Sequence, residues 1–394
     1  MRINKYLNRC DIYTLLWCYY IWHSTTQEEA SSFSQFVLLA CIAWSFVCMV
    51  RVIQSFKMPS YFRGLNILVA LFTIYGMVRL TGGRYIVSGV SVDALYSLKK
   101  AYISLIPIYA YFYYSKIGQL NTHRLKRYSL LFLALAFMAY FSYYAKRYGF
   151  ELDEEWEYTN NSGYKFLALM PIILFWRNRP LIFYSFLALT IIMIIMCMKR
   201  GAIVSGAIAL GIILFYSTKK MSGNRKAVVI FLTIGLLIGL FKYVNYLVEN
   251  NEYFMHRYND TMAGDANGRD TMYPMFFNYI LNRENIFTVL FGDGLDGSIK
   301  NFGIYCHNDW FEMTIDEGFL GLGCFIFYWI GFYKIVRKFK SDAWIYVPIL
   351  TIFTTNFFNT LFSFSINNMS ISVTCVLSYC LAQSSFKSNN RVYG

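Results

Sequence analysis

Charged residues are scarce in this 394-residue chain, because Asp, Glu, Lys and Arg make up 15% of it, against about 25% in an average soluble domain. This shortage excludes a soluble protein with a solvated surface. A cleavable signal peptide is not expected either, because no small-residue cleavage site follows the first apolar run. No long internal repeat is visible. Cys306 is the only cysteine in the long polar loop described below, so no disulfide is expected there.

Apolar residues dominate instead, since 57% of the chain is hydrophobic and 20% is aromatic. A membrane-spanning helix needs roughly 20 such residues, and runs of this kind recur from one end of the chain to the other. We therefore predict an all-α polytopic membrane protein, a single integral membrane domain over 1–394. The twelve expected spans lie near 11–24, 32–50, 64–80, 96–115, 128–145, 163–176, 180–198, 201–217, 227–248, 318–333, 343–362 and 365–383. One large loop, 249–317, separates spans nine and ten.

The positions of Lys and Arg predict how the spans are oriented, because the cytoplasmic loops of membrane proteins are enriched in both. With the N-terminus in the cytoplasm, the cytoplasmic segments hold 22 of the 36 basic residues against only Asp11 and Asp342, a net charge of +20. The other side then has a net charge of −6. We expect both termini in the cytoplasm and 249–317 outside. The basic balance is thus a topology signal that requires no nucleic-acid partner.

A few basic residues fall on the external side despite this rule. Lys199 and Arg200 form the tight turn between spans seven and eight, and Arg79 and Arg84 are also external. An arginine beside a span on this side is disfavoured during insertion, which points to a functional requirement at Arg200. The alternative is a side chain that simply extends to lipid phosphate.

The loop 249–317 is the largest hydrophilic segment, and such a loop is where water-dependent chemistry can take place in a membrane protein. The apolar residues of 270–287 fit one face of a helix lying at the membrane interface. These are Met272, Tyr273, Phe276, Phe277, Ile280 and Phe287. Further on, His307 and Asn308 precede a helical pattern that starts at Asp309, a place suited to an anionic lipid headgroup.

Short motifs follow one another along this loop. Arg269 comes first, followed by a Gly-x-Gly turn at 292–294 and by His307-Asn308. Glu317-Gly318 and a Gly-x-x-Gly at 318–321 then enter span ten. This order resembles the signature of the O-antigen polymerase/ligase superfamily.

An earlier segment adds to the resemblance. Lys199-Arg200-Gly201-Ala202 is similar to the Arg-Gly-Ala element that this family places at an external turn. The pattern departs at Phe311, which stands where Leu is commoner, and the pair Asp309-Trp310 has no assigned role in it. The span number and the late, large periplasmic loop agree with the family over the whole chain.

The resemblance implies a GT-C-like glycosyltransferase on the periplasmic face of the bacterial inner membrane. Its donor and acceptor would be glycans linked to undecaprenyl pyrophosphate, with no metal or other cofactor. A polymerase, which we favour, extends one lipid-linked repeat unit with another to make O-antigen or a related surface polysaccharide. A ligase instead transfers the glycan to lipid A–core. Membrane lipids and a chain-length regulator protein are the further partners implied.

The residue types suit this chemistry. Breaking the bond between an anomeric carbon and pyrophosphate requires a stabilised leaving group, and arginine binds phosphate with a planar, permanently charged fork. We therefore expect Arg200 and Arg269 to bind pyrophosphate. His307, with an ordinary pKa of about 6.5, is the candidate to accept or orient the acceptor's hydroxyl proton, and Glu317 is the alternative base. Weaker candidates for substrate binding complete the set: Arg84, Lys199 and Asn308.

A lipid-linked oligosaccharide flippase is the alternative from another functional class, since such transporters also have about twelve spans. A transporter is expected to show internal repeats and ionisable residues near the middle of the bilayer. Here the interiors of the spans are almost free of charge and the polar groups gather in one external loop. This distribution favours the enzyme.

Overall fold

The computed structural model of the protein describes residues 7–27, 31–81, 85–87, 90–92, 94–145, 160–219, 224–252, 254–255, 258–259, 269–362 and 370–389. Within these ranges the chain is almost entirely helical, which confirms the all-α class. A short antiparallel hairpin is formed by β1 (Tyr85–Val87) and β2 (Val90–Val92). The helices are α1 (Arg9–Thr26), α2 (Ser32–Ser55), α3 (Ser60–Thr81), α4 (Ala94–Leu105), α5 (Pro107–Lys116), α6 (Thr122–Ala145), α7 (Gly163–Leu167), α8 (Met170–Ile173), η3 (Leu174–Trp176), α9 (Pro180–Met196), α10 (Arg200–Lys219), α11 (Asn224–Asn250), α13 (Arg269–Leu281), α14 (Ile286–Phe291), α15 (Gly297–Phe302), α16 (Asp309–Asp316), α17 (Gly318–Lys338), α18 (Ala343–Phe362) and α19 (Ile371–Asn389).

Seven of the described helices are long and apolar enough to cross a membrane, namely α2, α3, α6, α10, α11, α17 and α18. Shorter apolar segments accompany them at Gly163–Trp176, Pro180–Met196 and Ile371–Gln383. These helices indicate a multi-pass membrane protein. By length and composition the described chain supports about seven spans, fewer than the twelve that the apolar runs predict.

Proline explains part of this difference, because two of the predicted spans are broken. The run 96–115 is divided into α4 and α5, and Pro107 begins α5. The run 163–176 consists of α7, α8 and the 3-10 helix η3, with Pro171 in the first turn of α8. Proline has no backbone N–H and is accommodated best in the first turn of a helix. Each of these prolines therefore marks a new helix where the apolar composition continues.

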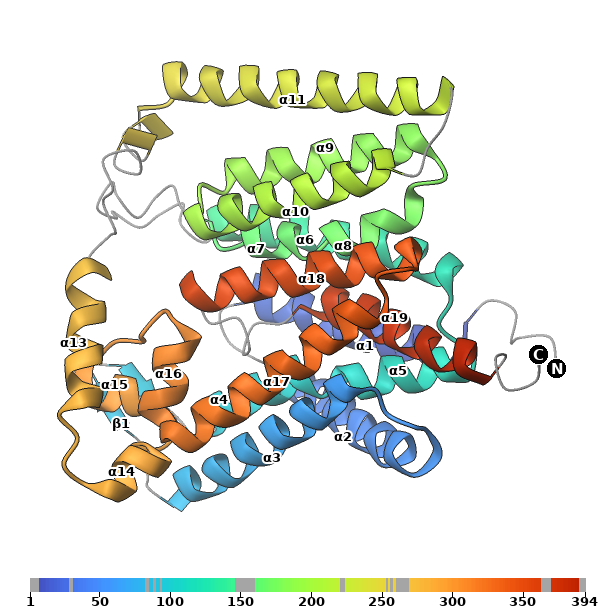
Figure 1. The fold of residues 1–394 in the computed structure, drawn as a ribbon. Coiled ribbons are helices and arrows are strands. Elements are labelled where there is room, and N and C mark those ends of the chain that lie inside the picture. Colours follow the sequence, from blue (N-terminus) through green and yellow to red (C-terminus); the bar gives the residue numbers. More distant parts are fainter. Residues whose placement is uncertain are drawn as a thin grey trace.

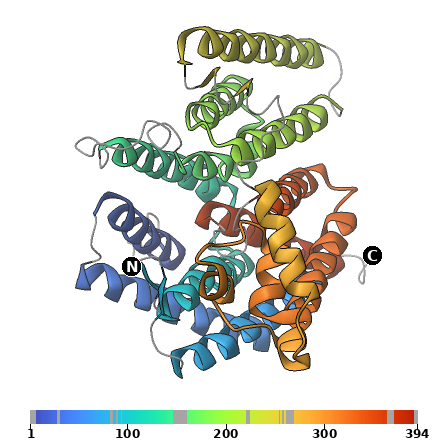
Figure 2. The same ribbon diagram turned by 90° about the vertical axis from the view of Figure 1, so that its left-hand side faces the viewer.

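The long helices lie side by side along roughly one direction (Figure 1). α3 packs against α17, α5 against α2 and α19, and α10 against α18. At one end of this bundle, on the left of Figure 1 and facing the viewer in Figure 2, α13 to α16 gather with the hairpin. α11 lies at the periphery in both views, with exposed apolar side chains such as Phe231 and Phe241. An apolar helix surface of this kind suits contact with lipid tails.

Polar contacts hold the opposite end of the bundle together. Arg124 at the start of α6 pairs with Asp11 in the first turn of α1 (Nε–Oδ2 3.1 Å). Lys116 at the end of α5 donates a hydrogen bond to the carbonyl of Ala382 in α19 (2.8 Å). The beginning of α1, the turn between α5 and α6, and α19 beyond its middle therefore lie close to one another.

The contact between α3 and α17 positions the polar end of the bundle. A Cβ at Gly64 would lie 2.5 Å from the Cα of Tyr328, so glycine permits the close approach of these helices. Near the other end of α3, the hydroxyl of Tyr75 donates to the carbonyls of Phe291 (2.7 Å) and Glu317 (3.3 Å). α3 thereby holds both the end of α14 and the residue that precedes α17.

The segment 270–287 differs from the single interfacial helix that its pattern predicts. It contains α13 and the first residues of α14, separated at 282–285. Phe277 and Phe287 are exposed (53% and 69%), but Phe276 is fully buried with Cys306 and Ile315. The prediction that Phe276 faces lipid is therefore wrong. The chain after α14 folds back over α13, and this long-range packing buries Phe276 and partly buries Met272, Tyr273 and Ile280 of the predicted apolar face.

Candidate functional site

His307 lies at a sharp corner of the chain just before α16. Its φ angle is +49°, in the left-handed region. The N–H of Cys306 donates to Oε2 of Glu312 (2.9 Å), which holds the residue on one side of the corner. On the other side, Asn308 caps α16, and its Oδ1 accepts from the N–H groups of Trp310 (2.9 Å) and Phe311 (3.3 Å). The imidazole itself is exposed.

The backbone at this corner is strained. Among the described residues, three that are not glycine have a positive φ angle: Met198, Asp296 and His307. Such a conformation costs about 1–3 kcal/mol at a non-glycine residue and is often found at functional sites. His307 is the predicted catalytic residue and Met198 directly precedes Lys199. One of the three strained residues is therefore a predicted site residue, and a second directly precedes one.

Basic side chains reach His307 from two other parts of the chain. Desolvation by the surrounding protein, followed by the positive charges of Arg269 and Lys199, holds the pKa of His307 below its ordinary value of 6.5. The ring is therefore neutral at neutral pH, and a neutral imidazole can accept a proton. The structure brings together three residues that are about 40 or more positions apart in the sequence.

The C-terminal end of α18 brings these segments together. The carbonyl of Phe362 accepts from Nη2 of Arg269 (3.1 Å), and the carbonyl of Leu361 accepts from the hydroxyl of Tyr273 (3.1 Å). Nδ2 of Asn308 donates to the carbonyl of Leu361 (3.5 Å). The start of α13 and the start of α16 are thus fastened to one helix end. The polar atoms of Asn308, predicted to bind substrate, are used in these protein contacts.

The turn that carries Lys199 and Arg200 adjoins the same helix end. A Cβ at Gly201 would lie 3.6 Å from the Cβ of Phe362 and 2.5 Å from the hydroxyl oxygen of Tyr164. Arg200 is the first residue of α10 and is half-buried. Four segments of sequence, near 199–202, 269–273, 306–308 and 361–362, therefore meet at one end of the bundle. Arg84, the remaining predicted phosphate-binding residue, lies outside the described residues.

Gly201 gives a direct test of this packing. We expect Gly201→Ala to lower the melting temperature, because overpacking against Tyr164 costs about 1–3 kcal/mol. Gly206 on the same helix is the matched control, since its Cβ would meet Ile194 at 3.4 Å, an ordinary contact. Gly206→Ala should be neutral or stabilising, because alanine is the better helix former. Equal melting temperatures for the two variants would contradict the packing described here.

Glu317, the alternative base, does not share the solvent-facing corner. It is 1% exposed and lies in a group of buried carboxyl side chains. The other members are Asp296, Glu312 and Asp316. Burial is the main cause that raises the pKa of Glu317 and of Asp316 well above the ordinary range, and it raises the pKa of Glu312 to about 7. Neighbouring carboxyls add to the shift, so protons are retained in this group.

Hydrogen bonds organise the buried carboxyl group. Asp316 accepts from the backbone N–H groups of Asp296 and Ser298 (both 3.0 Å), which joins α16 to the start of α15. The hydroxyl of Ser298 donates to Oε1 of Glu312 (2.5 Å). In the described chain, this group does not have the arrangement of a metal site. Sequence reasoning missed Glu312 and Asp316, although their spacing of four residues places both on one face of a helix.

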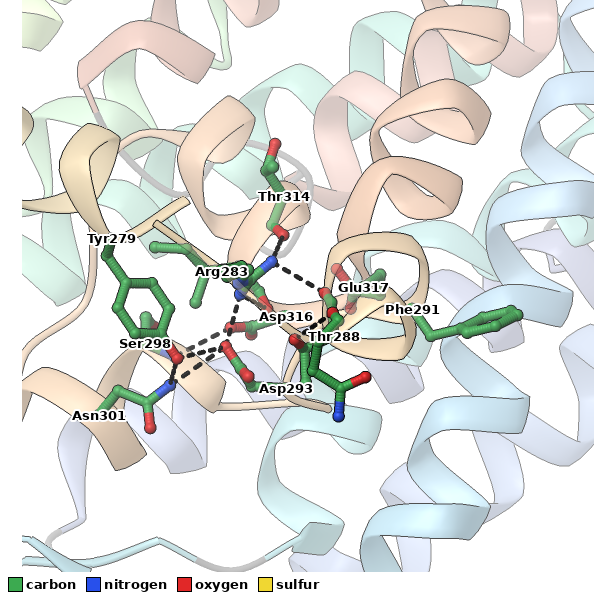
Figure 3. A network of polar contacts seen from close by, with 12 residues as sticks. Tyr279, Arg283, Thr288, Phe291, Asp293, Ser298, Asn301, Thr314, Asp316 and Glu317 are labelled. Carbon is green, nitrogen blue, oxygen red and sulfur yellow. Dashed lines mark hydrogen bonds and ion pairs between the residues drawn. The ribbon is translucent and has the colours of Figure 1, made fainter. Parts of the chain in front are cut away.

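Arg283, shown in Figure 3, is a third residue that the sequence analysis did not select. Its guanidinium pairs with Oδ2 of Asp293 (2.5 Å) and donates to the carbonyls of Thr288, Thr314 and Ile315 (2.9–3.1 Å). Arginine is suited to this place because its planar fork offers five N–H donors. These bonds connect the end of α13, the loop after α14 and the last turn of α16.

Backbone geometry explains why glycine occupies positions 292 and 318 of the predicted motifs. Gly292 has a φ angle of +73°, and a Cβ there would collide with the carbonyl of Asp316. Gly318 has a φ angle of +69°, and a Cβ there would lie 2.5 Å from the backbone of Leu290. Glycine adopts such angles without strain. The Gly-x-Gly turn and the Glu-Gly pair therefore pack on one another at the junction of α16 and α17.

Comparisons with known proteins found that no family model matches this chain and that no curated protein matches it. The resemblance to the O-antigen polymerase/ligase superfamily consequently rests on the motif residues themselves. What the chain does is therefore argued from the geometry around His307.

Proposed function

We propose that this chain is a glycosyltransferase of the bacterial inner membrane that polymerises lipid-linked oligosaccharide repeat units. The donor and acceptor are glycans on undecaprenyl pyrophosphate, and the product is O-antigen or a related surface polysaccharide. The observation that carries the proposal is the exposed, neutral His307 next to the cations Arg269 and Lys199 at one end of the helix bundle. A proton acceptor beside permanent positive charge suits the attack of a hydroxyl group and the departure of a pyrophosphate.

In the proposed reaction, the acceptor's hydroxyl oxygen forms a bond to the anomeric carbon of the donor. The bond from that carbon to the pyrophosphate oxygen breaks, and the electron pair leaves with the pyrophosphate. His307 takes the hydroxyl proton or orients the hydroxyl, while Arg200 and Arg269 stabilise the charge on the leaving group. The cluster lies where a lipid pyrophosphate can remain at the membrane surface with its tail in the bilayer.

The proposal includes twelve passes through the membrane, with α4–α5 counted as one broken pass and α7–α8–η3 as another. Both termini are cytoplasmic and the segment from α13 to α16 is periplasmic. The split of basic residues supports this orientation. Further support comes from two contacts at the end of the bundle away from α13 to α16. The beginning of α1 pairs with the start of α6, and α19 accepts a hydrogen bond from the end of α5.

The two arginines provide a test of the pyrophosphate contact. We expect Arg200→Lys and Arg269→Lys each to slow glycan transfer roughly ten- to hundredfold, because an ammonium group does not reproduce the bidentate fork and such contacts are worth about 1.5–3 kcal/mol. The rate is measured with purified enzyme in liposomes. Arg63→Lys, at an exposed position in the first turn of α3, is the matched control and should leave the rate unchanged. Wild-type rates for both site variants would rule out the bidentate role.

The function itself is tested with the same liposomes. Lipid-linked repeat units are added to the wild-type enzyme, and the products are separated by size. A ladder of longer glycans that remain on lipid is the expected result. Transfer only to added lipid A–core would identify a ligase. Movement of lipid-linked units across the bilayer, without any new glycosidic bond, would identify a transporter and reject the enzyme.

A further inference from the structure

The backbone conformation at His307 has to be stabilised by contacts of the neighbouring residues. A histidine with a φ angle of +49° is in a conformation that favours glycine or asparagine. Such a residue keeps this angle only when its neighbours are fixed by other contacts. Asn308 is fixed by its own cap on α16 and by its bond to Leu361. The other neighbour, Cys306, donates its N–H to Glu312, and its buried side chain packs with Phe276 and Ile315.

Glu312 connects this corner to the rest of the loop. Oε2 accepts from the N–H of Cys306 (2.9 Å), and Oε1 accepts from the hydroxyl of Ser298 (2.5 Å). Ser298 is held in turn by its backbone bond to Asp316 (3.0 Å). Glu312 and Ser298 are both buried, at 6% and 0% exposure, so neither side chain presents a surface to a substrate. Glu312 therefore influences chemistry at the corner through Cys306, whose backbone N–H it binds.

We propose that Glu312 is a positioning residue, which holds the imidazole of His307 toward Arg269 and Lys199 through the backbone N–H of Cys306. The proposal deepens the proposed function and rests on it for its catalytic consequence. Its structural part, the position of the imidazole, is independent of any activity. Glu312 and Glu317 thus differ in role although both are buried. In the part of the chain that the structure describes, Glu312 is the member of the buried carboxyl group that bonds to the N–H of Cys306.

Two substitutions separate positioning from simple loss of charge. Glu312→Gln retains an acceptor for the N–H of Cys306 and offers an amide donor to the hydroxyl of Ser298. Glu312→Leu has a similar size but removes both contacts. Ser298→Ala is a milder variant that removes only the hydroxyl contact and keeps the protein testable if the leucine variant does not fold. Glu284→Gln, at an exposed carboxyl of the same loop, is the matched control.

The experiment uses the full-length protein in lipid nanodiscs with two readouts. The first is the NMR titration of His307 in a protein whose other histidines, His23, His123 and His256, are replaced by glutamine. The second is the kcat and KM of glycan transfer. We expect Glu312→Leu to return the pKa of His307 toward 6.5 and to lower kcat at least tenfold with KM little changed. Ser298→Ala should change both readouts in the same direction by less, and Glu312→Gln and Glu284→Gln should retain wild-type values for both.

Each other outcome has a defined meaning. An unchanged His307 titration in both Glu312→Leu and Ser298→Ala would overturn the proposal, even if the melting temperature falls, because the role would then be structural only. Failure of Glu312→Gln to retain the wild-type titration would also overturn it. If the wild-type protein transfers no glycan, the proposed function fails, while the titration still decides whether Glu312 positions the imidazole.

Discussion

Replacement of His307 by alanine is expected to slow glycan transfer by a factor of about 10²–10⁴, the usual contribution of a general base. Neutral His307 accepts the hydroxyl proton in the proposed reaction, and alanine cannot. Folded protein should be retained, since the imidazole is exposed and the corner is held by Glu312 and Asn308. The measurement is the rate at which lipid-linked repeat units are extended in liposomes, with the melting temperature recorded in parallel.

Two further variants at this position separate the possible roles. His307→Gln can orient a hydroxyl but cannot take its proton, so substantial product from it would leave only the orienting role. His307→Asn serves as the folding control, because asparagine adopts the left-handed conformation more readily than most residues. It should be at least as stable as the wild type and equally deficient in transfer. Substantial product from the alanine variant would remove His307 from the mechanism.

Replacement of Arg283 by alanine is expected to unfold the segment from α14 to α16 locally while the long helices remain folded. The change leaves the carboxylate of Asp293 without its cation and removes the hydrogen bonds that Arg283 donates to three carbonyl groups. Removal of one partner of a buried ion pair typically destabilises by about 3–5 kcal/mol. Hydrogen exchange of residues 286–317 is the measurement, and exchange there should become much faster than in α3 or α18.

The neighbouring Glu284→Ala, at an exposed position, is the control and should leave exchange unchanged. A double variant, Arg283→Leu with Asp293→Leu, adds a sharper comparison. Since replacement of both partners by apolar residues is less harmful than removal of one, the double variant should exchange more slowly than Arg283→Ala. Normal exchange in Arg283→Ala would show that the network in Figure 3 does not hold this segment.

The class of the fold was accessible from composition alone. Helices α3, α10, α17 and α18 begin and end within a few residues of the apolar runs that predict them, because a helix inside a bilayer must satisfy its own backbone groups over its whole length. The breaks at Pro107 and Pro171 were missed because the runs 96–115 and 163–176 remain apolar across them. At these positions proline has no backbone N–H to continue the helix, so the helix ends although the apolar composition continues.

Some residues of the candidate site could be predicted from the sequence, and others could not. His307, Arg269 and Lys199 could be selected from residue type, motif and predicted side of the membrane, because most basic residues of this chain fall on the predicted cytoplasmic side. The burial of Phe276 contradicts the pattern of an exposed apolar face, since the pattern cannot include a partner that arrives from 302–315. The same limit applies to Glu312, which looks like an ordinary solvated carboxylate on a short amphipathic helix.

Composition and residue order alone predict the all-helical class, the position of the polar loop in the chain and the residue types of the proposed site. These features follow from local composition, because a span in the bilayer must be an apolar helix and because charged residues stay outside it. The packing of the helices shows that the end of α18 meets three other segments, that His307 occupies a left-handed corner, and that Glu312 rather than Glu317 bonds to this corner. Such features depend on hydrogen bonds between residues distant in sequence, and their geometry exists only once the helices have packed.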